Sequence, residues 1–400
     1  MRITCVGGGP AGLYFSILMK LRDPGHEVTV LERDPAGATY GWGVTYWAAL
    51  LDRCQEADPV SARAIREASV SWRHGVAHVG GERVVRPSDQ GFGIGRHRLL
   101  ELLADRAREL GVRIEYRREV REPGQVGPAD LVVAADGVNS ALRHGRFGPT
   151  VAHGSNRYAW LGTRKVFDAF TFAFERTRHG YVWCYGYPFD DGTSTCVVEC
   201  TEATWHGLEL DRLGEPEGLA RLGELFAEPL DGQPLLAGPG GLRWQTFRTV
   251  TNRRWSDGKV VLLGDAAHTT HYSIGAGTSL ALEDALALAA ALDRPGTPVP
   301  EALADYERER RHALLATQSA ARYSERWYQN VGRYLSLKPE QFFALLGQRH
   351  SPLLPYLPPQ LYYWANRAVE ESPALRRLRG RVGNQVARAL HAGRDGSGGR

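Results

Sequence analysis

The chain has 400 residues, 43% of them hydrophobic and 24% charged, which is the composition of a globular protein of roughly two to three domains and excludes a largely disordered one. A formal net charge of +4 is too small to indicate a nucleic-acid or membrane-surface partner. The five cysteines form no Cys-x-x-Cys pair and no Cys/His spacing indicates a metal site, so we expect a reduced, cytoplasmic protein without a metal.

No targeting or membrane segment is predicted. The apolar N-terminus is interrupted by glycines and a proline at residues 7–10, before the core of a signal sequence could form. The longest apolar helical stretch, residues 279–292, is too short to span a bilayer and contains Glu283 and Asp284.

Strand and helix patterns alternate along the first third of the chain. Residues 2–6 are typical of a buried strand, residues 11–21 of a helix and residues 26–32 of a second strand, which together make a βαβ unit. An amphipathic helix at 98–110, a strand at 113–116 and an apolar strand at 130–135 follow. The last of these is suited to a parallel sheet that is covered on both faces.

The pattern changes after Arg143. Residues 158–200 are rich in aromatic and β-branched residues with short turns, which indicates an antiparallel sheet, and residues 208–226 are helical in pattern. An apolar strand at 259–263 and a long helix from about Gly275 then resume the earlier style. From Val299 onward the pattern is mostly helical.

A glycine-rich turn joins the first predicted strand to the first predicted helix. Its sequence, GGGPAG, has the spacing G-x-G-x-x-G, follows a strand, opens a helix and precedes Glu32 at the end of the next strand. Gly7 would allow the tight turn, Gly9 a close approach to a pyrophosphate, and Gly12 close packing of the helix on the sheet. The helix N-terminus would offer N–H groups to the phosphates, and Glu32 would accept from the adenosine ribose. The turn therefore predicts a dinucleotide site.

Two further motifs follow buried strands. Asp136-Gly137 ends the strand at 130–135, where a plain strand, turn and capped helix is the structural alternative. Gly264-Asp265 ends the strand at 259–263, and Asp265 could accept from a ribityl or ribose hydroxyl. The glycines before the next helix would let backbone N–H groups meet a phosphate or a flavin carbonyl. The order and spacing of the three motifs favour one shared site.

The three motifs in this order resemble those of the FAD-dependent aromatic hydroxylases of the p-hydroxybenzoate hydroxylase type. Four segments are similar to one branch, that of salicylyl-CoA 5-hydroxylase, anthraniloyl-CoA monooxygenase and the violacein-pathway tryptophan-ring hydroxylase. They are GWGV at 41–44, YAWLGTRKVFDAF from Tyr158, STCVVEC from Ser194 and HTTHYSIGAGTSLALEDA from His268. The resemblance extends to about Leu345.

The resemblance implies an α/β fold in which a Rossmann-like FAD-binding domain is interrupted by an antiparallel-sheet substrate domain and followed by a helical C-terminal region. We expect the first FAD-binding part at 1–150, the substrate domain at 151–255, the second FAD-binding part at 256–320, the helical region at 321–390 and a disordered tail at 391–400.

The resemblance also implies which residues hold the cofactor. They are Gly7, Gly9, Ala11, Gly12, Glu32, Arg33, Arg96, Asp136, Gly137, Gly264, Asp265, Gly275 and Gly277. Around the reacting ring we expect Trp42, Val44, His271 and Tyr272 as catalytic residues, with a buried structural histidine as the alternative for His271 and a structural role for His268. Residues 271–274 replace the Pro-rich loop of the wider family, so we do not transfer the active-site roles of that loop to these residues.

The implied activity is single-component hydroxylation of an electron-rich ring with FAD, NADH or NADPH and O2, through a flavin C4a-hydroperoxide. The Trp- and Tyr-rich strands and the small net charge favour a small aromatic substrate of indole type from specialised metabolism. An aryl-CoA thioester is the alternative, and a non-oxygenating FAD reductase or binding flavoprotein is the alternative of another class. We expect a monomer or homodimer.

Overall fold

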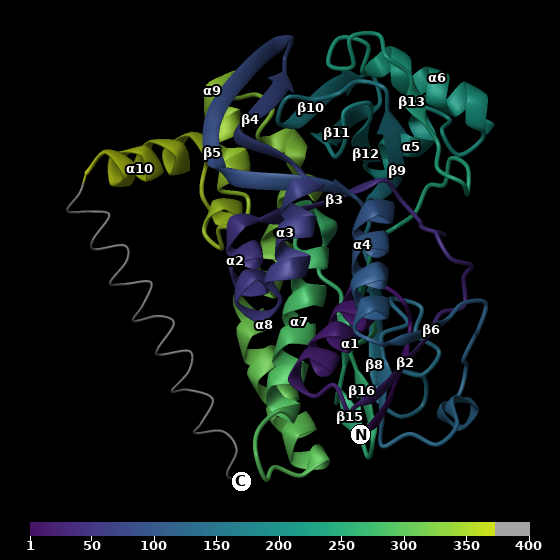
Figure 1. Cartoon of the computed structure of the whole chain (residues 1–400). Helices are drawn as coiled ribbons and strands as arrows, with labels where there is room; N and C mark the ends of the chain where they lie inside the picture. The colour runs from purple at the N-terminus through teal and green to yellow at the C-terminus, as the bar shows by residue number, and fades with distance from the viewer. Residues whose placement is uncertain (373–400) are drawn as a thin grey trace.

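Two β-sheets lie at opposite ends of the molecule, and long helices run beside and between them (Figure 1). The structure is a computed structural model that describes residues 1–372. The first sheet has six strands in the order β15-β16-β7-β1-β2-β6, all parallel except β15. Their bounds are β1 Arg2–Val6, β2 Glu27–Leu31, β6 Arg113–Glu115, β7 Leu131–Ala134, β15 Ser256–Asp257 and β16 Val260–Leu262.

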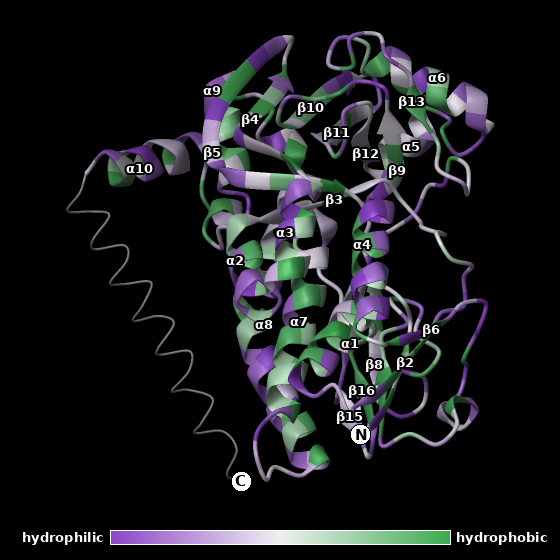
Figure 2. Ribbon diagram, in the orientation of Figure 1, coloured by the Kyte–Doolittle hydropathy of each residue, from purple (hydrophilic) through white to green (hydrophobic). Residues whose placement is uncertain are grey.

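The helices beside this sheet bury its apolar strands. Hydrophobic residues are concentrated in these strands (Figure 2), as expected for a sheet that is covered on both faces. Helix α1 buries every residue from Ala11 to Met19, and α7 is apolar enough to lie in the same core. The bounds of the helices in this part are α1 Pro10–Arg22, α2 Ala48–Ala57, α3 Pro59–Glu67, α4 Arg96–Glu109, α7 Gly277–Leu292 and α8 Val299–Gln329.

The second sheet has eight strands in the order β13-β9-β12-β11-β10-β4-β5-β3. Neighbours are antiparallel except for β10, which runs parallel to β4. The bounds are β3 Gly43–Trp47, β4 Val70–Val79, β5 Glu82–Gly95, β9 Arg157–Thr163, β10 Phe170–Thr177, β11 Gly180–Pro188, β12 Ser194–Cys200 and β13 Leu235–Leu236. A separate two-stranded sheet is formed by β8 (Pro149–His153), which follows β7 in the chain, and β14 (Arg248–Asn252), which precedes β15.

The boundaries that we predicted at residues 150 and 255 do not separate the two sheets. Strands β3, β4 and β5 come from residues 43–95, which we had assigned to the first FAD-binding part, and they complete the eight-stranded sheet. The β4–β5 hairpin turns at Gly80-Gly81, whose positive φ angles of 63° and 77° suit a tight turn between twisted strands. The helix that we predicted at 208–226 is shorter in the structure, where α6 spans Glu215–Leu225. A separate short helix, α5 (Glu202–Gly207), precedes it.

The two faces of the eight-stranded sheet have different neighbours. One face packs Cys184, Cys196 and Val198 against α5 and α6. The other face, which we call the aromatic face, is lined by Tyr158, Trp160, Phe172, Phe174, Trp183, Tyr185, Val197 and Glu199. Most of these pack with residues of α8, α9 and the turn at Tyr272.

The C-terminal region is helical as far as the structure describes it. Helix α9 spans Pro339–Gly347 and α10 spans Pro359–Glu371. Short 3-10 turns lie at Pro123–Val126, Gly264–Ala266, Tyr272–Ile274, Val331–Arg333 and Leu354–Tyr356. The rest of the predicted helical region, from residue 373, and the predicted tail at 391–400 lie outside the described residues.

Candidate active site

The three sequence motifs meet at one edge of the six-stranded sheet. They follow β1, β7 and β16, which are neighbouring parallel strands, so their carboxyl ends lie side by side. Backbone hydrogen bonds fix the loops to one another: Ala135 N–H donates to the Val6 carbonyl at 2.8 Å, and Leu263 N–H to the Ala134 carbonyl at 2.9 Å. A site outside the carboxyl ends of such strands is where open α/β sheets bind ligands.

The glycine turn after β1 has the geometry of a phosphate cradle. Gly7 has a φ of +111°, and a Cβ there would lie 2.2 Å from the Ala135 carbonyl oxygen. A Cβ on Gly12 would lie 2.2 Å from the Gly7 carbonyl oxygen, whereas a Cβ on Gly9 would meet nothing within 4 Å. Gly9 caps α1 without a side-chain hydrogen bond, and Ala11 is in the first turn. The open side at Gly9 and the free N–H groups of α1 fit a pyrophosphate.

Glu32 at the end of β2 closes this turn. Its Oε2 accepts from Gly8 N–H at 2.6 Å and its Oε1 from Asp34 N–H at 2.8 Å. The carboxylate is therefore held beside the glycine turn, with lone pairs left for ribose hydroxyls. Arg33 is exposed, and its Nε lies 3.5 Å from Asp34 Oδ2, so it is positioned at the rim of the turn.

Asp136 has one satisfied and one unsatisfied carboxylate oxygen. Oδ2 accepts from Ala141 N–H at 2.8 Å and from Leu142 N–H at 3.3 Å. Oδ1 is buried without a hydrogen-bond partner among residues 1–372, and burial raises the pKa of the carboxyl group. Gly137 follows with a φ of +76° and open space where a Cβ would stand. An unsatisfied buried acceptor beside an open backbone position fits a hydroxyl group of a bound cofactor.

Asp265 and Arg96 lie close enough for their charges to interact. The Asp265 side chain is open to solvent, yet desolvation by the surrounding protein raises its pKa, against the charges of His268 and Arg96. Burial lowers the pKa of Arg96, which the charge of Asp265 opposes, and its Nε has no hydrogen-bond partner in the described part of the chain. The Asp265 carboxylate therefore lies at the surface beside Arg96. Gly264, with a φ of +62°, makes the turn that places it there.

The turn that leads from this motif into α7 is fixed by a buried histidine. His271 is 6% exposed, its Nδ1 lies 2.9 Å from Ser273 Oγ, and it also accepts from Ser273 N–H at 3.3 Å. Burial lowers the pKa of His271 to about 3, so the ring is neutral at physiological pH. Gly275 has a φ of +64° and lies close to Thr45, where a Cβ would be 2.9 Å from the hydroxyl. Gly277 is exposed at the start of α7.

The segment at 41–44 joins the two sheets at the site. Gly43 N–H donates to Thr195 Oγ1 of β12 at 2.8 Å, and Arg96 N–H donates to the Trp42 carbonyl at 2.9 Å. The Trp42 ring covers Gly162, where a Cβ would approach it to 2.6 Å. Val44 pairs with Ile94 in the β3–β5 ladder and is partly exposed. These contacts place Trp42 between the cofactor loops and the aromatic face.

Two functional candidates were missed by the sequence analysis. Arg143 is buried and donates to the carbonyls of Val138 at 2.7 Å and Ala266 at 3.3 Å, so it ties the second motif to the third. Glu199 is fully buried on the aromatic face and accepts from Tyr272 at 2.8 Å. The available signals were an arginine one turn after Asp136-Gly137 and a single acidic residue inside the apolar run STCVVEC.

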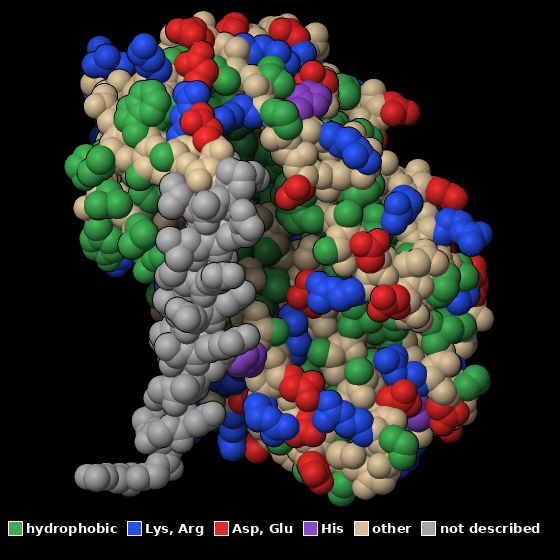
Figure 3. Space-filling view, turned by 90° about the vertical axis from the view of Figure 1, so that its left-hand side faces the viewer, with side chains coloured by type: hydrophobic (Ala, Val, Ile, Leu, Met, Phe, Trp, Pro, Cys, Tyr) green, Lys and Arg blue, Asp and Glu red, His purple; other side chains and the backbone are tan. Residues whose placement is uncertain are grey.

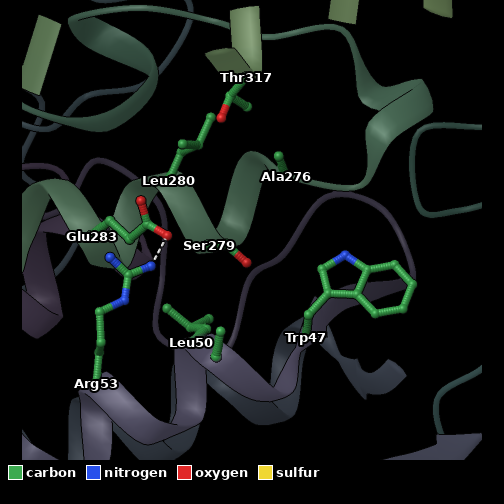
Figure 4. A pocket seen from close by; sticks show the side chains of 9 residues that line it. Trp47, Leu50, Arg53, Ala276, Ser279, Leu280, Glu283 and Thr317 are labelled. Carbon is green, nitrogen blue, oxygen red and sulfur yellow. Dashed lines mark hydrogen bonds and ion pairs between the residues drawn. The ribbon is translucent and has the colours of Figure 1, made fainter. Parts of the chain in front are cut away.

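A separate pocket of about 190 Å³ lies between the start of α2, α7 and α8 (Figure 4). Trp47, Leu50 and Arg53 line one side, Leu280 and Glu283 another, and Arg53 is ion-paired with Glu283. None of the predicted site residues lines this pocket, although Ala276, between Gly275 and Gly277, does. The pocket is therefore next to the candidate site but outside it.

Other groups near the site have structural partners. His268 Nε2 lies 2.8 Å from Asp284 Oδ2, and Asp284 in turn accepts from Arg310 Nε at 2.7 Å, as expected for a structural His268.

Within residues 1–372, no group of three or more His, Cys, Asp or Glu side chains is arranged to hold a metal ion, and no helix is long and apolar enough to cross a membrane. All five cysteines are free and buried. On the face seen in Figure 3, charges of both signs are mixed.

Comparison with known proteins identifies the family. Residues 1–320 match the model of the FAD binding domain family. A salicyloyl-CoA 5-hydroxylase of a Streptomyces species is 40% identical over 347 residues, which are 84% of this chain and 66% of that protein. The chain thus spans about two thirds of that relative's length. A 3-hydroxy-4-methyl-anthranilyl-(aryl-carrier protein) 5-monooxygenase of Streptosporangium sibiricum is 38% identical over 335 residues, 82% of this chain and 89% of that protein.

The fold is shared with a solved oxygenase. A crystal structure of a variant of 2-methyl-3-hydroxypyridine-5-carboxylic acid oxygenase superposes with a TM-score of 0.69 at 23% identity, covering 83% of this chain and 92% of that one. The chain therefore belongs to the FAD-binding family of aromatic hydroxylases, with FAD as its cofactor. The predicted family branch and fold class are confirmed.

Proposed function

We propose that the chain is a monooxygenase that uses NADH or NADPH and O2 to hydroxylate an electron-rich aromatic ring. One observation carries this proposal. The turn that leads out of the Gly264-Asp265 motif packs its Tyr272 ring against Tyr158 of the aromatic face, with centroids 4.6 Å apart. The cofactor loops and an aromatic surface therefore meet at one turn, which is the arrangement that a ring-oxidising flavoenzyme needs.

The protein's part in this chemistry is binding, orientation and exclusion of water. FAD, when bound, supplies the redox chemistry that activates O2 for insertion into the ring. Gly7, Gly9 and Gly12 would hold its pyrophosphate, Glu32 its adenosine ribose, and Asp265 with Arg96 its ribityl chain and phosphates. Trp42 and the aromatic face would enclose the reacting ring, because a loosely held ring or an open site lets activated oxygen escape as H2O2.

For the substrate we propose an aryl thioester, whose ring carries a hydroxyl or amino group. Both relatives described above act, by their names, on rings attached to coenzyme A or to an aryl-carrier protein. The favoured sequence-based expectation, an indole-type ring, is kept as the second candidate because the aromatic face carries Trp160 and Trp183 together with Tyr158 and Tyr185. We propose action in the cytoplasm, as a monomer or homodimer, without a nucleic-acid or membrane partner.

The test is coupled turnover of the FAD-loaded protein. NADH and NADPH oxidation is measured alone and with salicyloyl-CoA, anthraniloyl-CoA, the free acids or indole, and oxygenated product is quantified. The proposal predicts oxidation that rises with one aromatic compound and matches its product. Oxidation that no aromatic compound stimulates, without product, would instead identify a non-oxygenating flavoprotein. A thioester should also bind more weakly at high salt, because exposed phosphate–arginine pairs are screened, whereas indole binding should change little.

A further inference from the structure

The buried carboxylate of Glu199 accepts hydrogen bonds from three neutral side chains. Its Oε1 accepts from Asn156 Nδ2 at 2.7 Å, and its Oε2 accepts from the hydroxyls of Tyr272, at 2.8 Å, and Tyr185. The groups that oppose the effect of burial on its pKa are neutral hydrogen-bond donors, with Tyr185 first, then Asn156 and Tyr272. A buried charge is costly unless it is well hydrogen-bonded, so this group needs a reason to be retained.

The direction of these hydrogen bonds is fixed by the chemistry of the donors. The Trp183 indole N–H can only donate, and it donates to the Tyr185 oxygen at 2.9 Å. The Tyr185 proton is therefore free to point at Glu199. Burial raises the pKa of Glu199, but donors to both of its oxygens oppose this and satisfy the ionised form, with Asn156 on Oε1 and the tyrosines on Oε2. An ionised carboxylate has no proton to give, so the Tyr272 hydroxyl donates to it as well. Each tyrosine has a single hydroxyl proton, and in both cases that proton is committed to Glu199.

Of the three donors to Glu199, only Tyr272 is exposed enough to contact a ligand as well. Asn156 and Tyr185 are buried, whereas Tyr272 is partly exposed. Tyr272 also lies on the turn between the Gly264-Asp265 motif and α7, and its ring contacts Tyr158 of the aromatic face. Its oxygen has lone pairs left after its proton is given to Glu199, and these can only accept.

We propose that Glu199 is a positioning residue that makes the Tyr272 hydroxyl a hydrogen-bond acceptor, so that the site selects aromatic rings that carry a hydrogen-bond donor such as a ring hydroxyl, an amino group or an indole N–H. The inference rests on the proposed function, because it places the aromatic substrate beside Tyr272. Glu199 itself, being fully buried, acts only through Tyr272.

The substitution Glu199→Gln reverses the polarity of this arrangement. Asn156 still requires an acceptor, so the amide oxygen of the variant takes the place of Oε1 and its NH2 group takes the place of Oε2. That NH2 group donates to the Tyr272 oxygen, and the Tyr272 proton is released toward the site. The preference for donor-bearing rings is then lost, because two donors would face each other.

The experiment measures binding and needs no turnover. The FAD-loaded protein is titrated with two matched pairs, phenol against anisole and indole against 1-methylindole, and the perturbed flavin absorbance gives each dissociation constant. The wild type should favour the donor-bearing member of each pair by about ten-fold, the scale of one hydrogen bond to a group that would otherwise be unsatisfied. In Glu199→Gln and in Tyr272→Phe the ratio should fall to about one or below.

A control variant separates this role from general packing. Glu175→Gln removes a half-buried carboxyl from the opposite face of the same sheet, so it should keep the wild-type ratio. A wild type without discrimination, or discrimination that survives in Tyr272→Phe, overturns the proposal even if Glu199→Gln does not fold. Because no NAD(P)H is used, such a result leaves the proposed hydroxylation to be judged by its own product assay.

Discussion

Adding a methyl group at Gly9 should separate cofactor binding from folding. Gly9 has a φ of −76° and a ψ of 178°, an extended conformation that any residue adopts, and a Cβ there meets nothing within 4 Å. Gly9→Ala should therefore leave the stability of the FAD-free protein within about 1 kcal/mol of wild type, because the lower entropy of its unfolded chain opposes the weaker N-cap preference of alanine. The methyl group would stand on the open side of the turn and displace the pyrophosphate. Loss of one charge-assisted hydrogen bond, roughly 1.5–3 kcal/mol, corresponds to roughly ten- to hundred-fold weaker FAD binding.

Gly12→Ala should have the opposite pattern. Its Cβ would lie 2.2 Å from the Gly7 carbonyl oxygen, so the backbone must shift at a cost of about 1–3 kcal/mol in unfolding free energy. Gly124→Ala is the control, because it also has open space but lies outside the three motifs. The assays are urea unfolding of the FAD-free protein and fluorescence titration with FAD. Wild-type FAD affinity in Gly9→Ala, or wild-type stability in Gly12→Ala, would refute the assignment of the cradle.

Three further predictions concern titratable groups. Asp265→Asn should weaken FAD binding about ten-fold without lowering the melting temperature of the FAD-free protein, because no hydrogen bond to this carboxylate is found among residues 1–372 and burial raises its pKa; a lower melting temperature would contradict this. The pKa of His271 is lowered to about 3, so wild-type stability should fall as pH drops from about 6.5 toward 3, by roughly 5 kcal/mol at most, and urea unfolding of His271→Gln across that range should show a flatter slope. Burial, with a smaller effect of the Glu228 charge, raises the pKa of Glu175 to about 7. The favourable contribution of Glu175 to the free energy of unfolding is therefore present below about pH 4.5 and is lost as pH rises through 7. Glu175→Gln should thus be more stable than wild type at pH 8 but not at pH 4, and equal differences at both pH values would disprove it.

The cofactor motifs could be predicted from sequence because their geometry is local. A strand, a turn with fixed glycine positions and a helix follow one another within a few residues, and the conformation at Gly7 and the close contact at Gly12 are what that spacing demands. The parallel sheet that joins the three motifs follows from the same apolar strands. Arg143 escaped because its two carbonyl partners lie in different motifs, one of them 123 residues away.

The aromatic face could not be predicted in this way. It depends on long-range pairing, above all the parallel contact of β4 with β10, in which Gly75 is opposite Phe170. Nothing in residues 43–95 alone specifies that partner, although the glycine pair at 80–81 indicates the β4–β5 hairpin. The surroundings of Glu199 are equally non-local, since its three donors come from a loop, from β11 and from the turn after the third motif. The role of His271 was left open for the same reason: only the folded turn shows its bond to Ser273.

The central claim is that the chain inserts one atom of O2 into an aromatic ring, and isotope labelling tests it most directly. The FAD-loaded protein is supplied with NAD(P)H, ¹⁸O2 and the aromatic compound that best stimulates NAD(P)H oxidation, and the product is analysed by mass spectrometry. The account predicts a ring-hydroxylated product that carries a single ¹⁸O atom, with the other atom released as water. An unlabelled product, or NAD(P)H oxidation that yields only H2O2 with every aromatic compound of the panel, would contradict it.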